Sequence, residues 1–509
     1  MEGYAGEGAA AGAELAAGLA VLAGELTGLV SGLIAAGPVS FDEIEQQVSE
    51  QGRELLRKAA QLVLDVQAAG ERRLAGVADA AGVPRTRVER GHARTVVSQL
   101  GSVVIRRLAY RAPGQPNLHP RDAVLNLPVR RYSWPVQQAV VRYVLAGAYE
   151  QARQFLQAAA GITIGKQQLE QIAAEAARDA PGFYPSRPAP PCAAGLPLVI
   201  SADGKGVAMR PEARRRRGAK GPGQRVRTFA KRRGTGEKDG CKRMAETGVV
   251  FDVQPADGPP RTPEQIMTRA PGEPPVPGPK AVGRWYTVEI TASRAETIST
   301  LFDQAERRDP GHTRTWVALV DGDRHQIDVI RAEAASRGIT ITILIDFIHV
   351  LEYLWKAAWC FHPPRDPAME TWVTAQGLDI LHGRAGQVIS RITALAAANP
   401  PKPGGEHAKI IRTTLAYLDA KQPYLDYPRA LAAGWPIATG VIEGACRHLI
   451  HDRMGITGAR WSLPGAEAIL WLRAIRANGD LDAYWAYHIA QEHHRNHLSR
   501  YQNSQALAA

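Results

Sequence analysis

Residues 316–348, WVALVDGDRHQIDVIRAEAASRGITITILIDFI, contain two apolar runs separated by a helical segment. The runs WVALVDGD (316–323) and ITITILIDFI (339–348) are rich in β-branched residues, which favours strands. The segment between them, residues 324–338, has the length and composition of a helix. This strand–helix–strand order is typical of an α/β domain.

Three further strands are predicted before this stretch: LPLVISAD (196–203), TGVVFDV (247–253) and RWYTVEITAS (284–293). A helix follows the third strand, and the helix HVLEYLWKAAWC follows the fifth. Three strands followed by helix, strand, helix, strand and helix form the ribonuclease-H-like order. We therefore expect an α/β fold with a mixed five-stranded sheet, helices on both faces, and the first strand beside the fourth.

The chain of 509 residues is long enough for several domains, and a Pro-rich segment marks one boundary. We expect a linker at 185–195, between a mainly helical region at 41–184 and the α/β domain. Within the second half, mostly helical residues 350–432 predict an all-α insertion. The remaining assignments are the α/β domain at 196–349 and 433–478, a basic loop insertion at 205–282, and a C-terminal tail at 479–509.

The N-terminal region is the part that we expect to bind DNA. Its Gly/Ala-rich residues 1–40 predict a poorly ordered extension, and a hairpin is predicted near 93–114. Helical segments within 134–178 fit a helix-turn-helix module with 163–178 as the recognition helix, although a plain helical bundle has the same pattern. The apolar stretch 15–37 lacks a basic flank and has Glu25 in its middle, which argues against a signal or membrane segment.

The net charge of +12 comes entirely from residues 205–243, which hold 15 Lys or Arg and three acidic residues. Such a segment predicts a polyanionic partner, although a solvated loop has the same composition. The candidate DNA-binding residues there are Arg214, Arg215, Arg216, Arg217, Lys231, Arg232 and Arg233. The four cysteines lack Cys-x-x-Cys spacing, which argues against a zinc ribbon and fits a reducing cytoplasm.

Two carboxylates follow strands that we expect to be neighbours: Asp203 after the first and Asp321 after the fourth. Crowded carboxylates repel, and a divalent cation relieves that repulsion. Glu443, at the start of a helix, fits the third ligand of a site for two metal ions, and Arg447, one turn below it, is a candidate DNA-binding residue. Each Asp-Gly pair alone would equally make a turn.

Long stretches of the chain resemble the Kra-type insertion-sequence transposases, which are DDE, ribonuclease-H-like enzymes of bacteria. They include VISADGKGV, WVALVDGDRHQ, LIDFIHVLEYLWKAAWCF, KQPYLDYP and GWPIATGVIEGACRHLIHDRMGITGARW, and the resemblance covers roughly residues 41–501. It implies Asp203, Asp321 and Glu443 as catalytic metal ligands, with two Mg²⁺ or Mn²⁺ ions as cofactor.

Two smaller motifs carry their own alternatives. DFIH (346–349) resembles the Cys/Asp-x-x-His motif of Mutator-like enzymes, which gives His349 an auxiliary catalytic role. Alternatively, Asp346 caps the following helix and His349 belongs to the core. Arg460 and Trp461 could clamp a DNA end, whereas Trp461 could equally be a core residue.

Taken as a whole, these patterns predict a cytoplasmic, nucleoid-associated DNA transposase that cuts its element's ends and joins the 3′-hydroxyl to target DNA. Its partners would be DNA and further copies of itself, at least a dimer, and no membrane. The alternatives are a structure-selective nuclease on the same fold and a DNA-binding protein that no longer catalyses. An ATP-binding loop and zinc-hydrolase spacing are both absent from the sequence.

Overall fold

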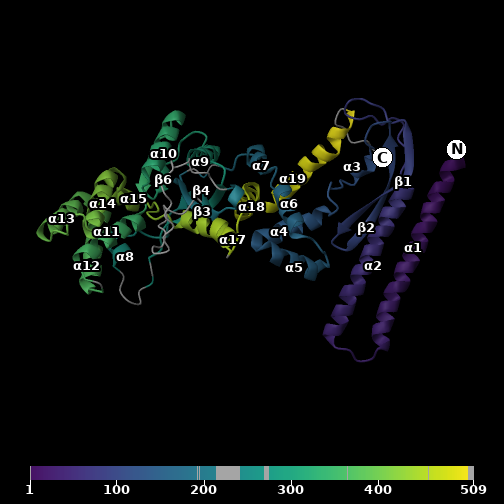
Figure 1. Ribbon diagram of the computed structural model, residues 1–509, viewed down its shortest axis with the longest axis horizontal. Helices are drawn as coiled ribbons and strands as arrows, with labels where there is room; N and C mark the ends of the chain where they lie inside the picture. The colour runs from purple at the N-terminus through teal and green to yellow at the C-terminus, as the bar shows by residue number, and fades with distance from the viewer. Residues whose placement is uncertain are drawn as a thin grey trace, which may run out of the picture. The chain divides into compact units, whose positions relative to one another are not determined.

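The computed structural model describes residues 2–191, 193, 195–213, 241–268, 274, 276–363, 365–456 and 458–502. The chain divides into two compact units (Figure 1). Unit 1 comprises Met1–Pro185 and Leu481–Ala509, and unit 2 comprises Ser186–Asp480. The boundary at Pro185 coincides with the start of the Pro-rich segment at 185–195.

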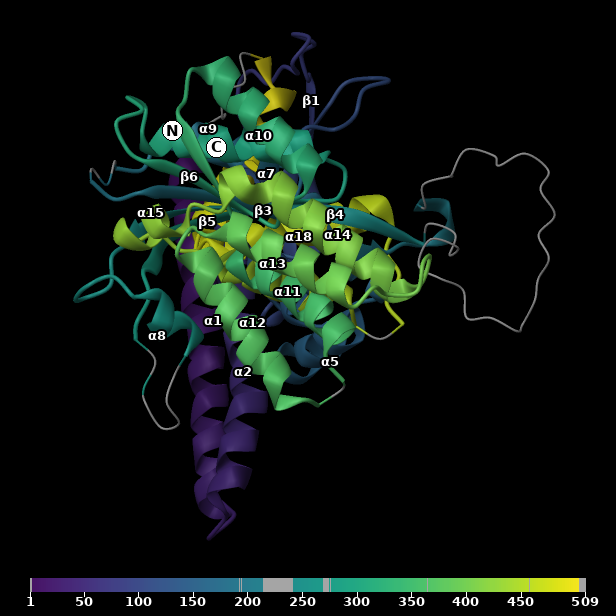
Figure 2. The same ribbon diagram turned by 90° about the vertical axis from the view of Figure 1, so that its left-hand side faces the viewer.

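Unit 1 begins with two long helices, α1 (Glu2–Ala35) and α2 (Phe41–Ala69), which lie side by side as an antiparallel pair (Figures 1 and 2). Glu25 of α1 forms an ion pair of 2.6 Å with Lys58 of α2. A Cβ on Gly18 would lie 2.5 Å from Leu62, so the glycine allows the helices to approach closely. The expectation of a poorly ordered extension is therefore wrong for α1, because alanine is a strong helix former and α2 supplies a packing surface.

One helix of the described chain is long and apolar enough to cross a membrane: Leu15–Ala35 within α1, with a mean hydropathy of 1.7. A single such helix near the N-terminus is weak evidence for a membrane span, because core helices and signal sequences have the same length and composition.

A hairpin and a group of short helices complete the N-terminal part of unit 1. The strands β1 (Arg87–Ser98) and β2 (Gly101–Arg111) pair antiparallel through a tight turn, which confirms the predicted hairpin. The helices are α3 (Pro120–Val124), α4 (Trp134–Ala146), α5 (Tyr149–Ala160), α6 (Lys166–Ala176) and α7 (Ala180–Ser186). Helices α4, α5 and α6 pack against one another, as the predicted three-helix module requires.

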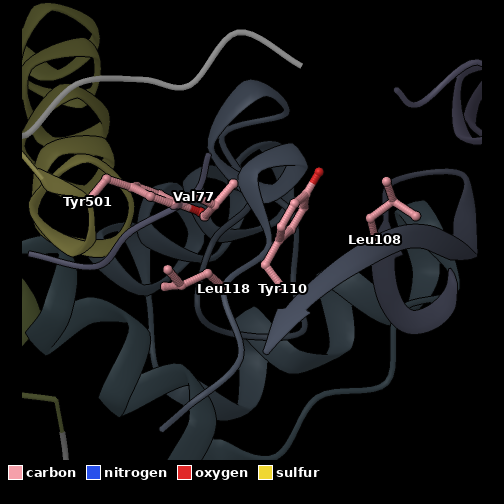
Figure 3. Packing of buried hydrophobic residues seen from close by; sticks show 5 residues of the cluster. All are labelled: Val77, Leu108, Tyr110, Leu118 and Tyr501. Atoms are coloured by element: carbon pink, nitrogen blue, oxygen red, sulfur yellow. The ribbon is translucent and has the colours of Figure 1, made fainter. Parts of the chain in front are cut away.

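The end of the chain returns to unit 1 and is not a tail. Helix α19 (Leu481–Asn496) and the short turn η4 (Leu498–Arg500) pack against the N-terminal elements. The buried Tyr484 donates a hydrogen bond to the carbonyl of Ala176. The side chain of Tyr501 packs with residues of the β1–β2 region (Figure 3): Val77, Leu108, Tyr110 and Leu118.

Unit 2 is built on a five-stranded mixed sheet in the order β5–β4–β3–β6–β7. The strands are β3 (Leu198–Ala208), β4 (Lys242–Gln254), β5 (Lys280–Glu289), β6 (Trp316–Val320) and β7 (Ile341–Ile345). Strands β3, β4 and β5 pair antiparallel, whereas β6 is parallel to both β3 and β7. All five predicted strands are thus present, and the first lies beside the fourth.

The strand bounds correct the predicted loop at 205–282. Strand β3 continues to Ala208 and β4 begins at Lys242, and these two residues pair with each other. Alternating charged and small residues hide this two-stranded extension in the sequence. The candidate residues Arg214, Arg215, Arg216, Arg217, Lys231, Arg232 and Arg233 lie outside the described residues.

Helices cover both faces of the sheet. Helices α9 (Arg294–Arg308) and α10 (Arg324–Arg337) lie on one side and α18 (Leu463–Ala477) on the other (Figures 1 and 2). Close packing of α9 depends on Gly248 of β4, where a Cβ would come within 2.6 Å of Leu301. The short helix α8 (Pro263–Met267) and turn η1 (Pro211–Ala213) belong to the connections between strands.

A run of helices separates β7 from the last part of unit 2, as predicted for residues 350–432. They are α11 (Phe347–Phe361), α12 (Pro367–Leu381), α13 (Ala385–Ala398), α14 (Glu406–Lys421), η2 (Gln422–Tyr424) and α15 (Tyr427–Ala432). The chain then forms α16 (Gly440–Ala445), the π-helical η3 (Cys446–His451) and α17 (Asp452–Met454). Buried Tyr427 joins this region to the sheet by donating a hydrogen bond to the Ile345 carbonyl at 3.0 Å.

The position of α19 predicts that Tyr484→Ala destabilises unit 1 by about 3 kcal/mol, because a fully buried aromatic ring and its hydrogen bond are lost. Urea denaturation followed by fluorescence measures this change. Trp359→Ala removes an exposed ring of α11 and should stay within about 0.5 kcal/mol of the parent. Equal midpoints for the two variants would restore the interpretation of 481–502 as a tail.

Candidate active site

Asp203 lies within β3, opposite Thr247 of β4. The parallel pairing of β3 with β6 ends at Ile200 and Ala318, three residues before Asp203. The carboxylate is half-buried and accepts a hydrogen bond of 3.4 Å from the Cys446 thiol. Burial, followed by the nearby Asp203 carboxylate, raises the pKa of Cys446 to about 12. Cys446 therefore remains a protonated donor at neutral pH.

Asp321 directly follows the last residue of β6. It lies three positions after Ala318, as Asp203 lies three positions after Ile200. If the same parallel register continued beyond the last pair, the two aspartates would lie opposite each other on adjacent segments of the sheet. The backbone N–H of Asp323 donates to Asp321 Oδ1 at 2.9 Å, and the Tyr417 hydroxyl donates to its backbone carbonyl at 3.3 Å.

Glu443 belongs to α16, which packs against β3 and β4, the strands that carry Asp203 and Thr247. Its side chain is exposed, and Glu443 Oε1 accepts a hydrogen bond of 3.1 Å from the hydroxyl of Thr439. One turn later the helix widens into η3, a π-helical turn of the kind often found at functional sites. This turn brings Cys446 to Asp203, so a single helical segment contacts the site at two points.

Asp346 and His349 join Glu443 in a compact group. One ligand atom from each of the three residues lies within 4.8 Å of the others. The fully buried Asp346 caps α11 by accepting from the N–H of Ile348 at 2.9 Å, which confirms the capping interpretation. Its other oxygen accepts from the Thr439 hydroxyl at 2.5 Å. Asp346 therefore caps α11 and also lies next to His349 and Glu443 in the candidate site.

His349 is half-buried, with Nδ1 3.7 Å from Asp346 Oδ2. Its contact with Asp346 raises the pKa of His349 above the usual value, and Asp321 adds to the effect against the opposing influence of burial. His349 therefore does not belong to the sealed core. The electrostatic link to Asp321 ties the Asp346–His349–Glu443 group to the end of β6.

The predicted metal ligands are consequently divided in the described part of unit 2. Glu443 lies in a group with ligand-like spacing, whereas no such group of three includes Asp203 or Asp321. Carboxylate oxygens are the donors that Mg²⁺ and Mn²⁺ prefer, so the residue types fit a divalent cation. Asp203 and Asp321 are joined to this group by the β3–β6 register and by the packing of α16.

A second group with ligand-like spacing lies in unit 1: Asp179, His488 and Glu492. Asp179 accepts from His488 at 2.7 Å and from Arg495 at 2.6 Å, and Arg495 also pairs with Glu492. The guanidinium of Arg495 already balances the charge of these carboxylates. The group is therefore an internal ion-pair network that holds α19 in unit 1.

Sequence reasoning missed an arginine that faces the acidic groups from α9. Arg294 lies 3.2 Å from Glu246 of β4 and 3.4 Å from Asp323. Burial opposes its charge, but Glu246, Asp323 and Asp321 together raise the pKa of Arg294 above the usual value. No spacing in the sequence connects these residues, because they come from three separate elements.

Of the other predicted DNA contacts, Arg447 and Arg460 are exposed, whereas Trp461 is not. Trp461 is buried, its indole N–H donates to the Met454 carbonyl at 3.3 Å, and Arg453 covers its ring at 4.7 Å. The prediction that Trp461 stacks on a DNA end is therefore wrong. Its backbone also extends the sheet by bonding to Ala208 and Arg210.

No model of a known protein family matches this chain, and no curated protein is significantly similar to it. The case for a function therefore depends on the residues of the chain itself.

The contact between Cys446 and Asp203 predicts that Cys446 resists thiol reagents in the native chain at about pH 8, where an ordinary exposed cysteine reacts. Titration with a chromogenic disulfide should count the same number of reactive thiols in the parent and in Cys446→Ala. In denaturant the parent should show one more thiol than the variant. A missing native thiol in Cys446→Ala would contradict the buried, protonated state.

Proposed function

We propose that this chain is a metal-dependent DNA transposase of the DDE class, with a ribonuclease-H-like catalytic domain in unit 2. The observation that supports it most is that β3, which carries Asp203, pairs with β6, which Asp321 follows directly, while α16, which carries Glu443, packs against β3. The strand order β5–β4–β3–β6–β7 agrees with the order expected for that domain. The sequence resemblance to Kra-type transposases supplies the reaction.

In this proposal Asp203, Asp321 and Glu443 hold divalent cations. Bound ions of this kind lower the pKa of water and stabilise the attacking and leaving oxygens of an in-line displacement at phosphorus. Carboxylates gathered at this edge of the sheet would otherwise repel, and among the described contacts the cationic side chains are His349 beside Asp346 and Arg294 beside Glu246 and Asp323. The donor set and the charge imbalance both favour cation binding.

The neighbouring residues orient these ligands. Thr439 holds Glu443 and Asp346 through one hydroxyl, and Cys446 holds Asp203 through its thiol. Arg294 fixes Asp323, whose backbone N–H in turn holds Asp321. Nδ1 of His349 faces Asp346, and the imidazole can donate a hydrogen bond to a phosphate oxygen.

Helices α4, α5 and α6 are the proposed DNA-reading module. A short connection containing Gly161 in the left-handed conformation separates α5 from α6, as in a helix-turn-helix. The buried side of α6 faces the module, and its exposed side carries Lys166, Gln167 and Gln171. Glutamine and lysine side chains are suited to contacts with base edges and phosphates.

The first test is cleavage of DNA that carries the sequences flanking this gene. Asp203→Asn, Asp321→Asn and Glu443→Gln should each reduce cleavage and strand transfer by about 10³-fold or more, because each removes a ligand charge from the site. Binding to the same DNA should change little. EDTA should stop the reaction, and added Mg²⁺ or Mn²⁺ should restore it.

Asp328→Asn is a matched control, because Asp328 is exposed on α10 and pairs only loosely with Arg324 at 3.9 Å. It should leave cleavage unchanged. If Asp346→Asn abolishes cleavage while Asp321→Asn does not, the second catalytic aspartate is Asp346. Cleavage without joining of the 3′-hydroxyl would point to a nuclease on the same fold.

The basic segment gives a separate prediction about binding. Replacing Arg214, Arg215, Arg216 and Arg217 by alanine should weaken binding to all DNA sequences and flatten the salt dependence by about 0.9 log unit per lost phosphate contact. Gln167→Ala with Gln171→Ala should instead weaken only binding to the preferred sequence. Fluorescence anisotropy over a range of salt concentrations separates the two effects. An unchanged salt slope in the arginine variant would leave the segment as a spacer.

A further inference from the structure

Helix α1 presents a second apolar stripe that α2 does not cover. Leu15, Leu19, Leu26 and Val30 follow one another at intervals of four, seven and four residues, which is the spacing of a coiled-coil seam. Their side chains remain between 38% and 54% exposed. Gly18, Leu22, Leu29 and Leu33, each three residues later, are the less exposed positions on the α2 side. The two stripes therefore lie side by side on α1, about 60° apart.

Helix α2 continues the exposed stripe. The contacts Glu25–Lys58 and Gly18–Leu62 set the register of the antiparallel pair, which places Leu56 level with Leu26 and Val63 level with Leu19. Both α2 residues are more than half exposed. Helical geometry directs them away from the side of α2 that contacts β2, where Gln61 bonds to Val104. We call Leu15, Leu19, Leu26, Val30, Leu56 and Val63 the outer face.

The charge of α1 limits what can cover the outer face. Helix α1 contains no lysine or arginine, and within Leu15–Ala35 the single charged residue, Glu25, is already paired with Lys58. Nucleic acid and anionic membrane surfaces are bound through basic residues, which this helix lacks. Crossing a membrane would place Glu25 within the bilayer and separate α1 from α2. Of the partners considered for the outer face, this leaves an apolar protein surface of similar length.

We propose that the outer face binds the outer face of a second copy of this chain, forming an antiparallel four-helix bundle about a two-fold axis. A two-fold interface joins a patch to itself, so an apolar, uncharged patch meets a matching one. The outer face from Leu15 to Val30 is about 23 Å long and two helix diameters wide, which is about 500 Å² per copy. The pair would bury about 1,000 Å², which matches the roughly 1,000 Å² that specific interfaces need. This inference does not depend on the proposed transposase activity.

The test is the mass of the full chain in solution without DNA, measured by sedimentation equilibrium. The parent should be a dimer, and the double variant Leu19→Glu with Leu26→Glu should raise the dissociation constant by at least about 100-fold, because four carboxylates would enter the interface. Val21→Glu with Gly28→Glu is the matched control. It has the same seven-residue spacing on the opposite side of α1, where Val21 is exposed and a Cβ on Gly28 has open space.

The control pair should remain dimeric, and circular dichroism should show that both variants keep the helical content of the parent. A monomeric parent, or a Leu19/Leu26 variant as dimeric as the control, would overturn the proposal. Sedimentation with vesicles of zwitterionic and anionic lipid tests the other occupant. A monomer that binds vesicles through Leu19 and Leu26 would assign the outer face to a membrane instead.

Discussion

The parallel pairing of β3 with β6 is the constraint on which the arrangement of unit 2 depends. The two strands pair from Leu198 and Trp316 as far as Ile200 and Ala318. Asp203 lies three positions after Ile200, and Asp321 lies three positions after Ala318. Two carboxylates at one level repel, and the cost grows as the site is removed from water. The fold must therefore bring opposite charge to this edge of the sheet.

Two cationic side chains supply part of the positive charge that these carboxylates need. Arg294 reaches the edge from α9 and contacts Glu246 and Asp323, while His349 lies beside Asp346 on the opposite side of β6. The acidic residues of the described neighbourhood still outnumber these two: Asp203 and Glu443 have no ion pair among the described contacts, and Asp321 interacts with Arg294 and His349 without a direct ion pair. A divalent cation would complete the balance without adding another side chain.

The helices between β7 and α16 are joined to the sheet at the same place. The backbone N–H of Phe347 donates to Ile437 at 2.8 Å, and the Thr439 hydroxyl bonds to Asp346, so the two ends of the helical run meet. Closing a long loop costs little more entropy than closing a short one. The length of the insertion can therefore vary while Glu443 stays next to Asp346. This explains how two neighbouring carboxylates can come from residues far apart in the sequence.

The sequence predicted those features that depend on local pattern. Runs of β-branched residues identified all five strands, and the Pro-rich segment that starts at Pro185 lies at the boundary between the units. Sequence patterns failed where distant contacts decide the outcome: the β3–β4 extension through Ala208 and Lys242, and the pairing of Arg294 with Glu246. None of these contacts has a periodicity or a spacing that could be read along the chain.

The return of α19 to unit 1 is the least local of these features and constrains how the protein can be assembled. Trp134 of α4 packs edge-on against Trp485 and His488 of α19, and the ring of Tyr484 is fully buried. The three-helix module α4–α6 therefore shares its core with the end of the chain. Unit 2 is an insertion between α7 and α19 in topological terms. A chain that ended before α19 would leave that core open to water, so the proposed DNA-reading module is complete only when the sequence that follows the catalytic unit has also folded.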